Sequence, residues 1–127
     1  MSFATERASI EGRLASNWTT TDIAYVNVPF APDNAAPWVR LNILNGESGP
    51  RNVNDGKRHL GVIVLQIFVP QNTGTATART YADSLATIFE DAQFSGIVCD
   101  VASIETIGNT GTWYQINVTV GYWRDED

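Results

Sequence analysis

The C-terminal stretch from Trp113 to Trp123 alternates between two kinds of side chain, a pattern typical of a half-buried β-strand. One face consists of Tyr114, Ile116, Val118, Val120 and Tyr122. The other face consists of Trp113, Gln115, Asn117, Thr119 and Trp123. This second face is polar but carries no charge, whereas a strand face turned to bulk water usually includes some Lys, Glu, Asp or Arg. The pattern therefore predicts a strand and raises the question of what covers its polar face.

Earlier segments show similar alternation. In residues 38–45 the apolar face consists of Val39, Leu41 and Ile43. In residues 61–69 one face consists of Ile63, Leu65, Ile67 and Val69, and the other of Val62, Val64, Gln66 and Phe68. A strand that is apolar on both faces is typical of the middle of a sheet, so residues 61–69 are predicted to be a central strand. Residues 97–108 are predicted to add a further strand or a pair of strands.

Two segments have helical periodicity. Residues 3–16 are predicted to form an amphipathic helix, with an apolar stripe made of Phe3, Ile10, Leu14 and Trp18. A second helix is predicted after residue 74, where apolar residues step by four and three positions. Its stripe consists of Ala78, Ala82, Leu85, Phe89 and Ala92. A threonine at position 75 or 77 is expected to cap its start, and Gly96 follows its end.

The order of these elements predicts an α+β fold. We expect a two-layer sandwich, with a mainly antiparallel β-sheet and both helices packed on one face. Residues 27–37 hold three of the five prolines and should run as an irregular lead-in, because proline cannot donate a hydrogen bond within a sheet. The chain has no internal repeat and no linker, so residues 1–127 are predicted to form a single domain.

The sheet face opposite the helices is the candidate functional surface. Its candidate contact residues are Arg40, Asn42, Gln66, Trp113, Gln115, Asn117 and Thr119, accompanied by Trp38 and Phe68. Arg40 is the only charged residue in this set. The centres of protein interfaces are poor in Lys, Asp and Glu and rich in aromatic residues and Arg, so this composition favours a subunit or partner interface. A neutral solvent-exposed face and the floor of a ligand site are the alternatives.

Residues 45–61 are predicted to be a long loop between neighbouring strands, because the segment is rich in Gly and Asn and is longer than a hairpin turn needs. Its candidate assembly residues are Arg51, Lys57, Arg58 and His59. Positive charge is concentrated here in an acidic chain. We therefore expect residues 46–59 to be mobile in the free protein and to become ordered against an acidic neighbour.

Net charge and hydropathy argue against two classes of partner. A net charge of -6 and a pI near 4.6 leave no basic surface for direct binding of nucleic acid. No apolar run approaches the ~18 residues needed to cross a bilayer, and no signal peptide is evident. We expect a soluble protein that is made in a cytoplasm and has no membrane partner.

No catalytic or metal-binding constellation is evident in the sequence. His59 is the only histidine and follows two cations in the predicted loop, so a Ser/His/Asp relay is not expected. Residues 49–58 lack the glycine spacing of a phosphate-binding loop and the Ser or Thr that follows its lysine. Cys99 is the only cysteine, which excludes an internal disulfide and a Cys-rich zinc site. We expect no enzyme activity, no cofactor and no metal.

Four stretches together resemble a known family, in the same order and over most of the chain. They are NWTTTDIAYVNVPFAP, WVRLNIL with the Gly-rich segment after it, GVIVLQIFVPQNTGTATARTYADSLATIF, and IGNTGTWYQINVTVGYW. These stretches are similar to tail terminator-like proteins of long-tailed bacteriophages (siphoviruses). The resemblance implies a structural subunit that assembles into a ring, commonly a hexamer. Such a ring sits on the last ring of the tail tube, stops its growth and presents the surface that joins the head.

The resemblance also implies partners and a location. The partners are further copies of the chain, the tail tube protein and a head-completion or connector protein. The location is the head-proximal end of the virion tail, after assembly in the cytoplasm of the bacterial host. A head-tail connector or a tail tube subunit is the closest alternative function. A small-molecule-binding or enzymatic α+β domain is a weaker one, because the polar face offers only Arg40 for acid-base chemistry.

Overall fold

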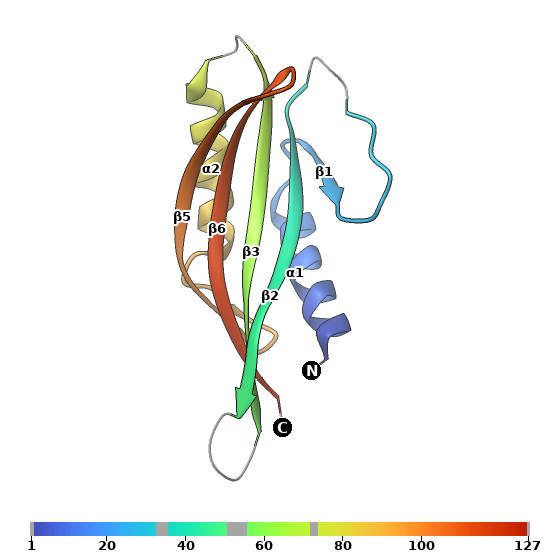
Figure 1. The fold of residues 1–127 in the computed structure, drawn as a ribbon, viewed down its shortest axis with the longest axis vertical. Helices are drawn as coiled ribbons and strands as arrows, with labels where there is room; N and C mark the ends of the chain where they lie inside the picture. Colours follow the sequence, from blue (N-terminus) through green and yellow to red (C-terminus); the bar gives the residue numbers. More distant parts are fainter. Residues whose placement is uncertain (1, 33–35, 51–55, 72–73, 127) are drawn as a thin grey trace.

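The computed structural model describes residues 2–32, 36–50, 56–71 and 74–126. Its helices are α1 (Phe3–Asn17) and α2 (Thr75–Phe89). Its strands are β1 (Asp22–Tyr25), β2 (Trp38–Pro50), β3 (Lys57–Pro70), β4 (Gln93–Phe94), β5 (Ile97–Thr110) and β6 (Trp113–Glu126). Figure 1 shows a tall sheet with both helices on one side of it and with the two ends of the chain at the same end of the molecule.

The described strands form one sheet in the order β1-β2-β3-β6-β5-β4. β1 pairs with β2 in parallel, and the other neighbouring pairs are antiparallel. The predicted α+β class with two helices is confirmed, but the sheet is mixed and curved rather than a flat antiparallel layer. A parallel pair requires a long return connection, and the 12 residues between Tyr25 and Trp38 are enough for one. The curvature follows from twist that accumulates along strands of 13 and 14 residues.

The hydrophobic core lies between this sheet and the two helices. The predicted inward faces of the long strands are confirmed, since their alternate residues are buried. These residues are Val39, Leu41, Ile63, Leu65, Ile67, Val69, Ile116, Val118, Val120 and Tyr122, with Ile43 and Tyr114 partly buried beside them. The helices contribute Ile10, Leu14, Ala78, Ala82, Leu85 and Phe89.

The helices differ from prediction at their ends. Phe3, assigned to the buried stripe of α1, is 50% exposed, whereas Glu6, four residues before Ile10, is 2% exposed. The start of α2 is capped by Gly74, at φ 83°, rather than by a threonine side chain. Because α2 ends at Phe89, residue 92 lies beyond the helix.

The prediction of a long loop at residues 45–61 is wrong for the residues that the structure describes. β2 continues to Pro50, and β3 begins at Lys57. The two strands are paired over this stretch, from Asn45 with Gly61 to Pro50 with Lys57. We call residues 45–50 and 57–61 the β2–β3 arm. The prediction from local composition was wrong because β6 pairs with the β3 half of the arm along its whole length. A bulge between Asn45 and Ser48 also accommodates the glycine-rich part of β2. Arg51 lies outside the described residues.

Gly61 is a position in the arm where no side chain fits. A Cβ atom there would overlap the ring of Tyr122, which faces Gly61 across the β3–β6 register and is 2% exposed. We expect Gly61→Ala to lower the free energy of unfolding by about 1–3 kcal/mol, the usual cost of overpacking. Urea unfolding measures the loss. Gly12→Ala in α1 is the matched control, because a Cβ at Gly12 meets nothing within 4 Å; equal losses in the two variants would contradict the account.

Candidate interaction surfaces

The predicted polar face forms one surface on the side of the sheet away from the helices. Arg40 pairs with Gln66, and Gln66 pairs with Asn117. In the adjacent row, Asn42 and Thr119 flank the same residue of β3. The sheet register therefore brings together five of the seven candidate contact residues, and each of these five is half-buried.

The remaining two candidates, Gln115 and Trp113, lie farther along β6. Gln115 is 7% exposed, and its side-chain amide donates a hydrogen bond to Asn117 Oδ1 at 2.9 Å. Gln115 Oε1, the side-chain amide oxygen, accepts a hydrogen bond from the Thr110 hydroxyl at 3.2 Å. Gln115 is thus held by its own chain, while Trp113 packs against an aromatic cluster next to it.

The aromatic cluster answers part of the question of what covers the polar face. Trp38 stacks on Phe68 with ring centroids 4.2 Å apart, and Phe30 packs on Trp38 at 5.0 Å. The Arg40 guanidinium lies 5.1 Å from the Trp38 ring. Phe30 comes from the irregular segment that follows β1. The chain therefore covers this end of the face itself, whereas the residues in its middle are half-buried.

β5 extends the polar face and adds a charge that the sequence analysis missed. Ser103 pairs with Thr119, and Glu105 pairs with Asn117. Alternation in the sequence of β5 could not show which of its side chains lie on the polar face, because its register against β6 shifts twice. Glu105 and Arg40 lie at opposite ends of one row, so the central part of the face remains uncharged.

Arg58 in the β2–β3 arm already has an acidic partner within its own chain. Its Nε donates to Asp125 Oδ1 at 2.8 Å and its Nη2 donates to Asp125 Oδ2 at 3.1 Å. The guanidinium also lies 4.0 Å from the centre of the Trp123 ring. The hydrogen bonding by Asp125 raises the pKa of Arg58. Arg58 is therefore held on β6, and of the predicted assembly residues Lys57 is the exposed cation beside it.

His59 is a packed residue, although it was predicted in a solvated loop. It is 6% exposed, its Nδ1 is hydrogen-bonded to Ser48 Oγ at 2.6 Å, and its Nε2 lies 3.5 Å from Glu126 Oε2. A serine, a histidine and an acid also form a row in serine hydrolases, but there the serine bonds to Nε2 and the acid to Nδ1. The arrangement here is reversed, and it fastens both strands of the arm to the end of β6.

A buried ion pair lies beside His59. Arg124 is fully buried, and its Nε donates to Glu6 Oε1 at 2.7 Å. Its Nη1 donates to Glu126 Oε1 at 3.1 Å, and Asn45 Nδ2 donates to Glu6 Oε2 at 3.2 Å. We call Glu6, Asn45, His59, Arg124 and Glu126 the buried polar cluster. It joins α1, β2, β3 and β6 at the base of the arm.

The pKa shifts of two buried groups fix their charge at neutral pH. Burial lowers the pKa of Arg124, but hydrogen bonds with Glu6 and Glu126 outweigh burial and raise the pKa overall. Burial also raises the pKa of the Tyr122 hydroxyl, and the adjacent negative charge of Glu6 raises it further. Arg124 therefore stays charged and Tyr122 stays neutral. The ion pair between Arg124 and Glu6 can hold the elements together only in this charge state, because a buried charge without a partner is costly.

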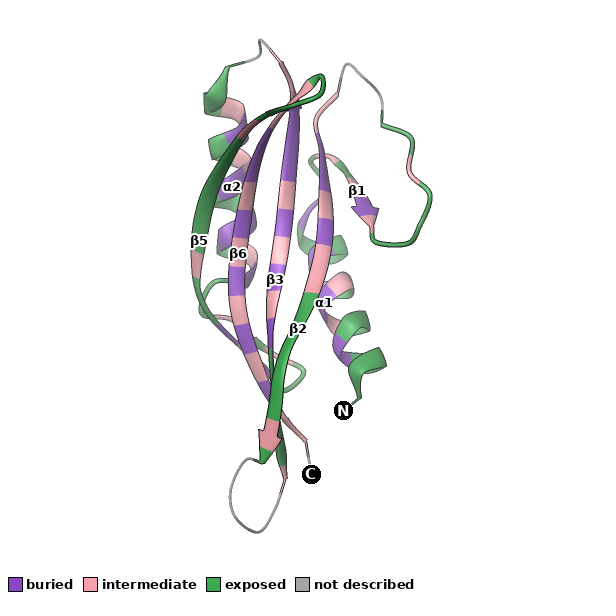
Figure 2. Cartoon of the chain, in the orientation of Figure 1, coloured by how far each residue is buried: buried purple, intermediate pink, exposed green. Residues whose placement is uncertain are grey.

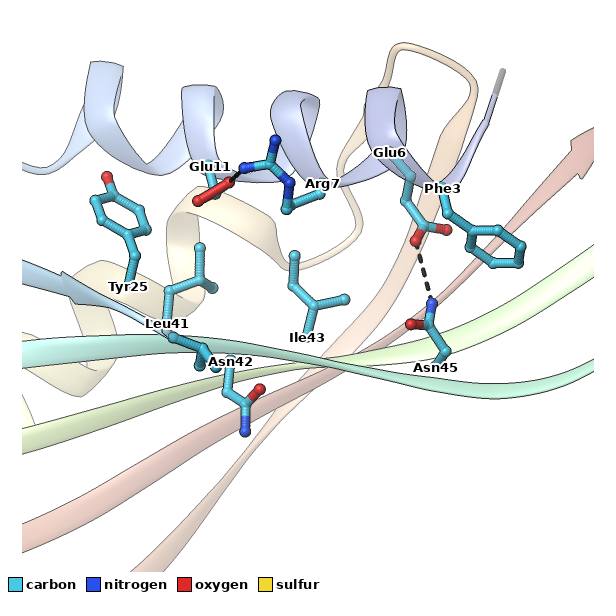
Figure 3. Close-up of a pocket in the computed structure, with 10 residues that line it drawn as sticks. Phe3, Glu6, Arg7, Glu11, Tyr25, Leu41, Asn42, Ile43 and Asn45 are labelled. Carbon is cyan, nitrogen blue, oxygen red and sulfur yellow. Dashed lines mark hydrogen bonds and ion pairs between the residues drawn. The ribbon is translucent and has the colours of Figure 1, made fainter. Parts of the chain in front are cut away.

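A groove of about 290 Å³ lies between α1 and the edge of β2 (Figure 3). Its lining residues are Phe3, Glu6, Arg7, Glu11, Tyr25, Val26, Leu41, Asn42, Ile43 and Asn45. Figure 3 shows Leu41 and Ile43 pointing from β2 toward α1, and the Glu6–Asn45 hydrogen bond at one end. The groove thus combines an apolar floor with a charged helical rim.

Sequence periodicity contains a signal for the buried polar cluster that was overlooked. Glu6, Ile10 and Leu14 are spaced by four, which places Glu6 on the buried stripe of α1. Arg124 follows Tyr122 by two, which places it on the inward face of β6. Two opposite charges at predicted core positions indicate a buried pair. That they meet across 118 residues depends on the tertiary fold and could not be read from local pattern.

Among the described residues, no three His, Cys, Asp or Glu side chains gather in a way that could hold a metal ion. No helix in this part of the chain has the length and hydropathy needed to cross a membrane. Cys99 is 4% exposed, and burial raises the pKa of its thiol to about 11, as expected for a structural residue.

The variant Glu6→Ala tests the buried ion pair. It removes the nearest partner of the buried Arg124 guanidinium, so we expect unfolding free energy to fall by about 3–5 kcal/mol. Glu11→Ala is the control, because Glu11 pairs with the exposed Arg7 on α1 and should contribute less than about 1 kcal/mol. Urea unfolding compares the variants. Similar losses of unfolding free energy in both variants would show that the buried ion pair does not stabilise the fold more than an exposed one.

Comparisons with known proteins address the whole chain. The sequence model of the phage tail terminator protein family matches residues 7–122. Twenty chains of solved structures match the fold. One of these is 21% identical to this chain. The match has a TM-score of 0.75 and covers 100% of this chain and 97% of the other. At this identity the match shows the fold alone. A search of curated proteins finds no match.

The family match extends from α1 to β6 and is not confined to one motif. It includes all of β3 and α2, most of α1 and β6, and all but the last residue of the stretches on which the sequence resemblance was based. The resemblance is therefore confirmed. This chain belongs to the phage tail terminator protein family.

Proposed function

We propose that this protein forms a ring that caps the tail tube of a long-tailed bacteriophage, terminates tube polymerisation and provides the surface that joins the head. The match of residues 7–122 to the tail terminator family carries the proposal. Membership in that family makes the chain a structural component of a phage tail, and so of the virion. We propose a structural role without catalysis.

The proposed ring has three kinds of partner. Further copies of the chain complete the ring, and six copies is the number that the family resemblance implies. The tail tube protein lies on one side of the ring, and a head-completion or connector protein lies on the other. A closed ring requires two different surfaces of each subunit to meet head to tail.

We assign the polar face to contact with another subunit or with the tube. Its candidate residues are Arg40, Asn42, Gln66, Trp113, Gln115, Asn117 and Thr119. The middle of this face carries amides and hydroxyls but no charge, so covering it costs less than desolvating ionised groups. Its half-buried side chains are also held in one register by three strands, which reduces the entropy lost on binding.

The β2–β3 arm is proposed to act as a preformed projection, not as a loop that folds on binding. His59 is packed at its base, and Arg58 is held by Asp125. The described part of the arm therefore needs no ordering on assembly, and its exposed cation Lys57 is the residue that can meet an acidic neighbour. For residues 46–50 and 57–59, the proposal thus replaces the expectation of mobility; residues 51–55 lie outside the described residues.

The variant Thr119→Glu tests the polar face. A carboxylate at this position would be left unpaired in a desolvated contact, so capping should fail while the fold survives. The measurement adds purified protein to assembling tube protein and determines tube lengths by electron microscopy. The parent should give tubes of limited length, and Thr119→Glu should give longer tubes at an unchanged melting temperature.

Thr87→Glu is the matched control, because Thr87 is exposed on α2, on the opposite side of the sheet. It should cap tubes as the parent does. If Thr119→Glu also caps tubes normally, the polar face is not a contact surface. If the parent itself leaves tube length unchanged, the proposed termination function is wrong.

A further inference from the structure

One edge of the sheet is left uncovered along β2. β1 pairs with β2 only from Trp38 to Leu41, so no described strand covers residues 42–50. Leu44, within this stretch, is 52% exposed. Figure 2 shows the exposed stretch in the lower half of β2. The groove between α1 and β2 opens beside the start of this edge, since Asn42 and Asn45 are among its lining residues.

The opposite edge of the same sheet is uncovered along β5. β4 pairs only with residues 97 and 98, and turn residues bond to the backbone as far as Asp100. No described strand covers residues 101–110. Val101, Ile104 and Ile107 are 61%, 43% and 44% exposed along this stretch. Natural edge strands are usually shortened or protected by lysine or proline, so a long edge with apolar residues indicates a missing partner.

We propose that residues 42–50 of β2 in one copy pair with residues 101–110 of β5 in the next copy, alongside the groove under α1. The inference rests on the proposed ring and names the contact between its subunits. The two uncovered stretches are of nearly equal length and lie on opposite edges of one sheet. They are therefore two different surfaces that can meet repeatedly around a ring.

Strand direction fits this pairing. β2 runs antiparallel to β3, β3 to β6, and β6 to β5, so β2 and β5 run in opposite directions. Rotation about a ring axis carries one copy into the next without reversing its strands. The β5 edge of the next copy therefore meets β2 in antiparallel orientation, which gives the more stable ladder.

The heights of the two stretches in the sheet also fit a closed ring. Asn42 lies, through Val64, in the same row as Thr119. Thr110 lies in the row of Trp113, six residues earlier on β6. If Asn42 pairs with Thr110 of the next copy, adjacent copies are staggered by about 20 Å at ~3.3 Å per residue. The stagger is set by the positions of Asn42 and Thr110 within one subunit, so the pairing does not require the sheet to be distorted.

A stagger of this size sets the tilt of the strands in the ring. The four long strands of one copy span about 19 Å at ~4.8 Å per strand. A shift of about 20 Å over this width corresponds to a tilt of about 45°, close to the range of roughly 35–45° that closed barrels adopt. Full pairing of the two edges is therefore compatible with closure.

The apolar side chains support the same contact. Ile107 of the next copy would lie opposite Asn45, beside the groove whose floor includes Leu41 and Ile43, and Ile104 would lie farther along the same β2 edge. Leu44 would lose its exposure in the same contact. The pairing thus covers exposed apolar surface from both copies and satisfies two rows of backbone hydrogen-bonding groups.

Cysteine cross-linking tests the pairing. In a Cys99→Ala background, one variant carries Leu44→Cys and a second series carries Ser103→Cys, Glu105→Cys, Ile107→Cys or Thr110→Cys. Neither kind of variant should cross-link alone under mild oxidation. Mixing the two should give disulfide-linked heterodimers. The highest yield is expected with Thr110→Cys, because the proposed register places Leu44 opposite residue 108 and Thr110 lies two residues farther along β5 on the same face. A chain that carries both cysteines should give a ladder of oligomers that ends at the size of the ring.

Charge substitutions give a second readout without cysteines. Ile104→Lys should abolish the ring in native mass spectrometry and leave the melting temperature unchanged. Thr87→Lys is the control, because Thr87 is exposed on α2 and belongs to neither edge strand, and it should leave the ring intact.

The outcomes separate this inference from the proposed function. Rings that form in the parent, resist Ile104→Lys and give no mixed cross-links would overturn the edge pairing while leaving the ring intact. Cross-links within Leu44→Cys alone would show a symmetric β2–β2 contact and would also overturn it. A parent that stays monomeric with and without tube protein would overturn both proposals.

Discussion

The antiparallel ladder between β3 and β6 is the constraint on which the rest of the structure depends. It pairs Lys57–Pro70 with Trp113–Glu126 without a register shift. Because side chains alternate along both strands, this single register assigns one face to the helices and the other to the polar surface over the full height of the molecule. A slip by one residue would exchange the two faces. The polar face, the β2–β3 arm and the buried polar cluster all take their positions from this ladder.

The same ladder explains how much could be predicted from the sequence. The apolar stripes of β2, β3 and β6, and that of α2 as far as Phe89, were read correctly because the sequence repeats them every two or every three to four residues. Those stripes were enough to place Arg40, Gln66 and Asn117 on one face. The family could also be recognised, because its resemblance is spread over stretches that form the core strands and helices.

What the sequence could not show depends on contacts between distant segments. The arm has the composition of a loop, but β6 pairs with it and His59 is packed against Glu126. β1 has four residues and forms because β2 lies beside it. Glu6 and Arg124 each occupy a core position that local pattern marks as unfavourable for a charge, and only their pairing makes both acceptable. In each case the tertiary neighbour outweighs the local preference.

The central claim is that copies of this chain close into a ring on the end of a tail tube. Electron cryomicroscopy of tubes assembled with this protein would test it most directly, by imaging the tube ends. The account predicts one added ring at one end only, with the long sheet of each subunit continuous with that of the next and the helices on one side of it. Bare tube ends, or this protein repeated along the tube, would contradict it.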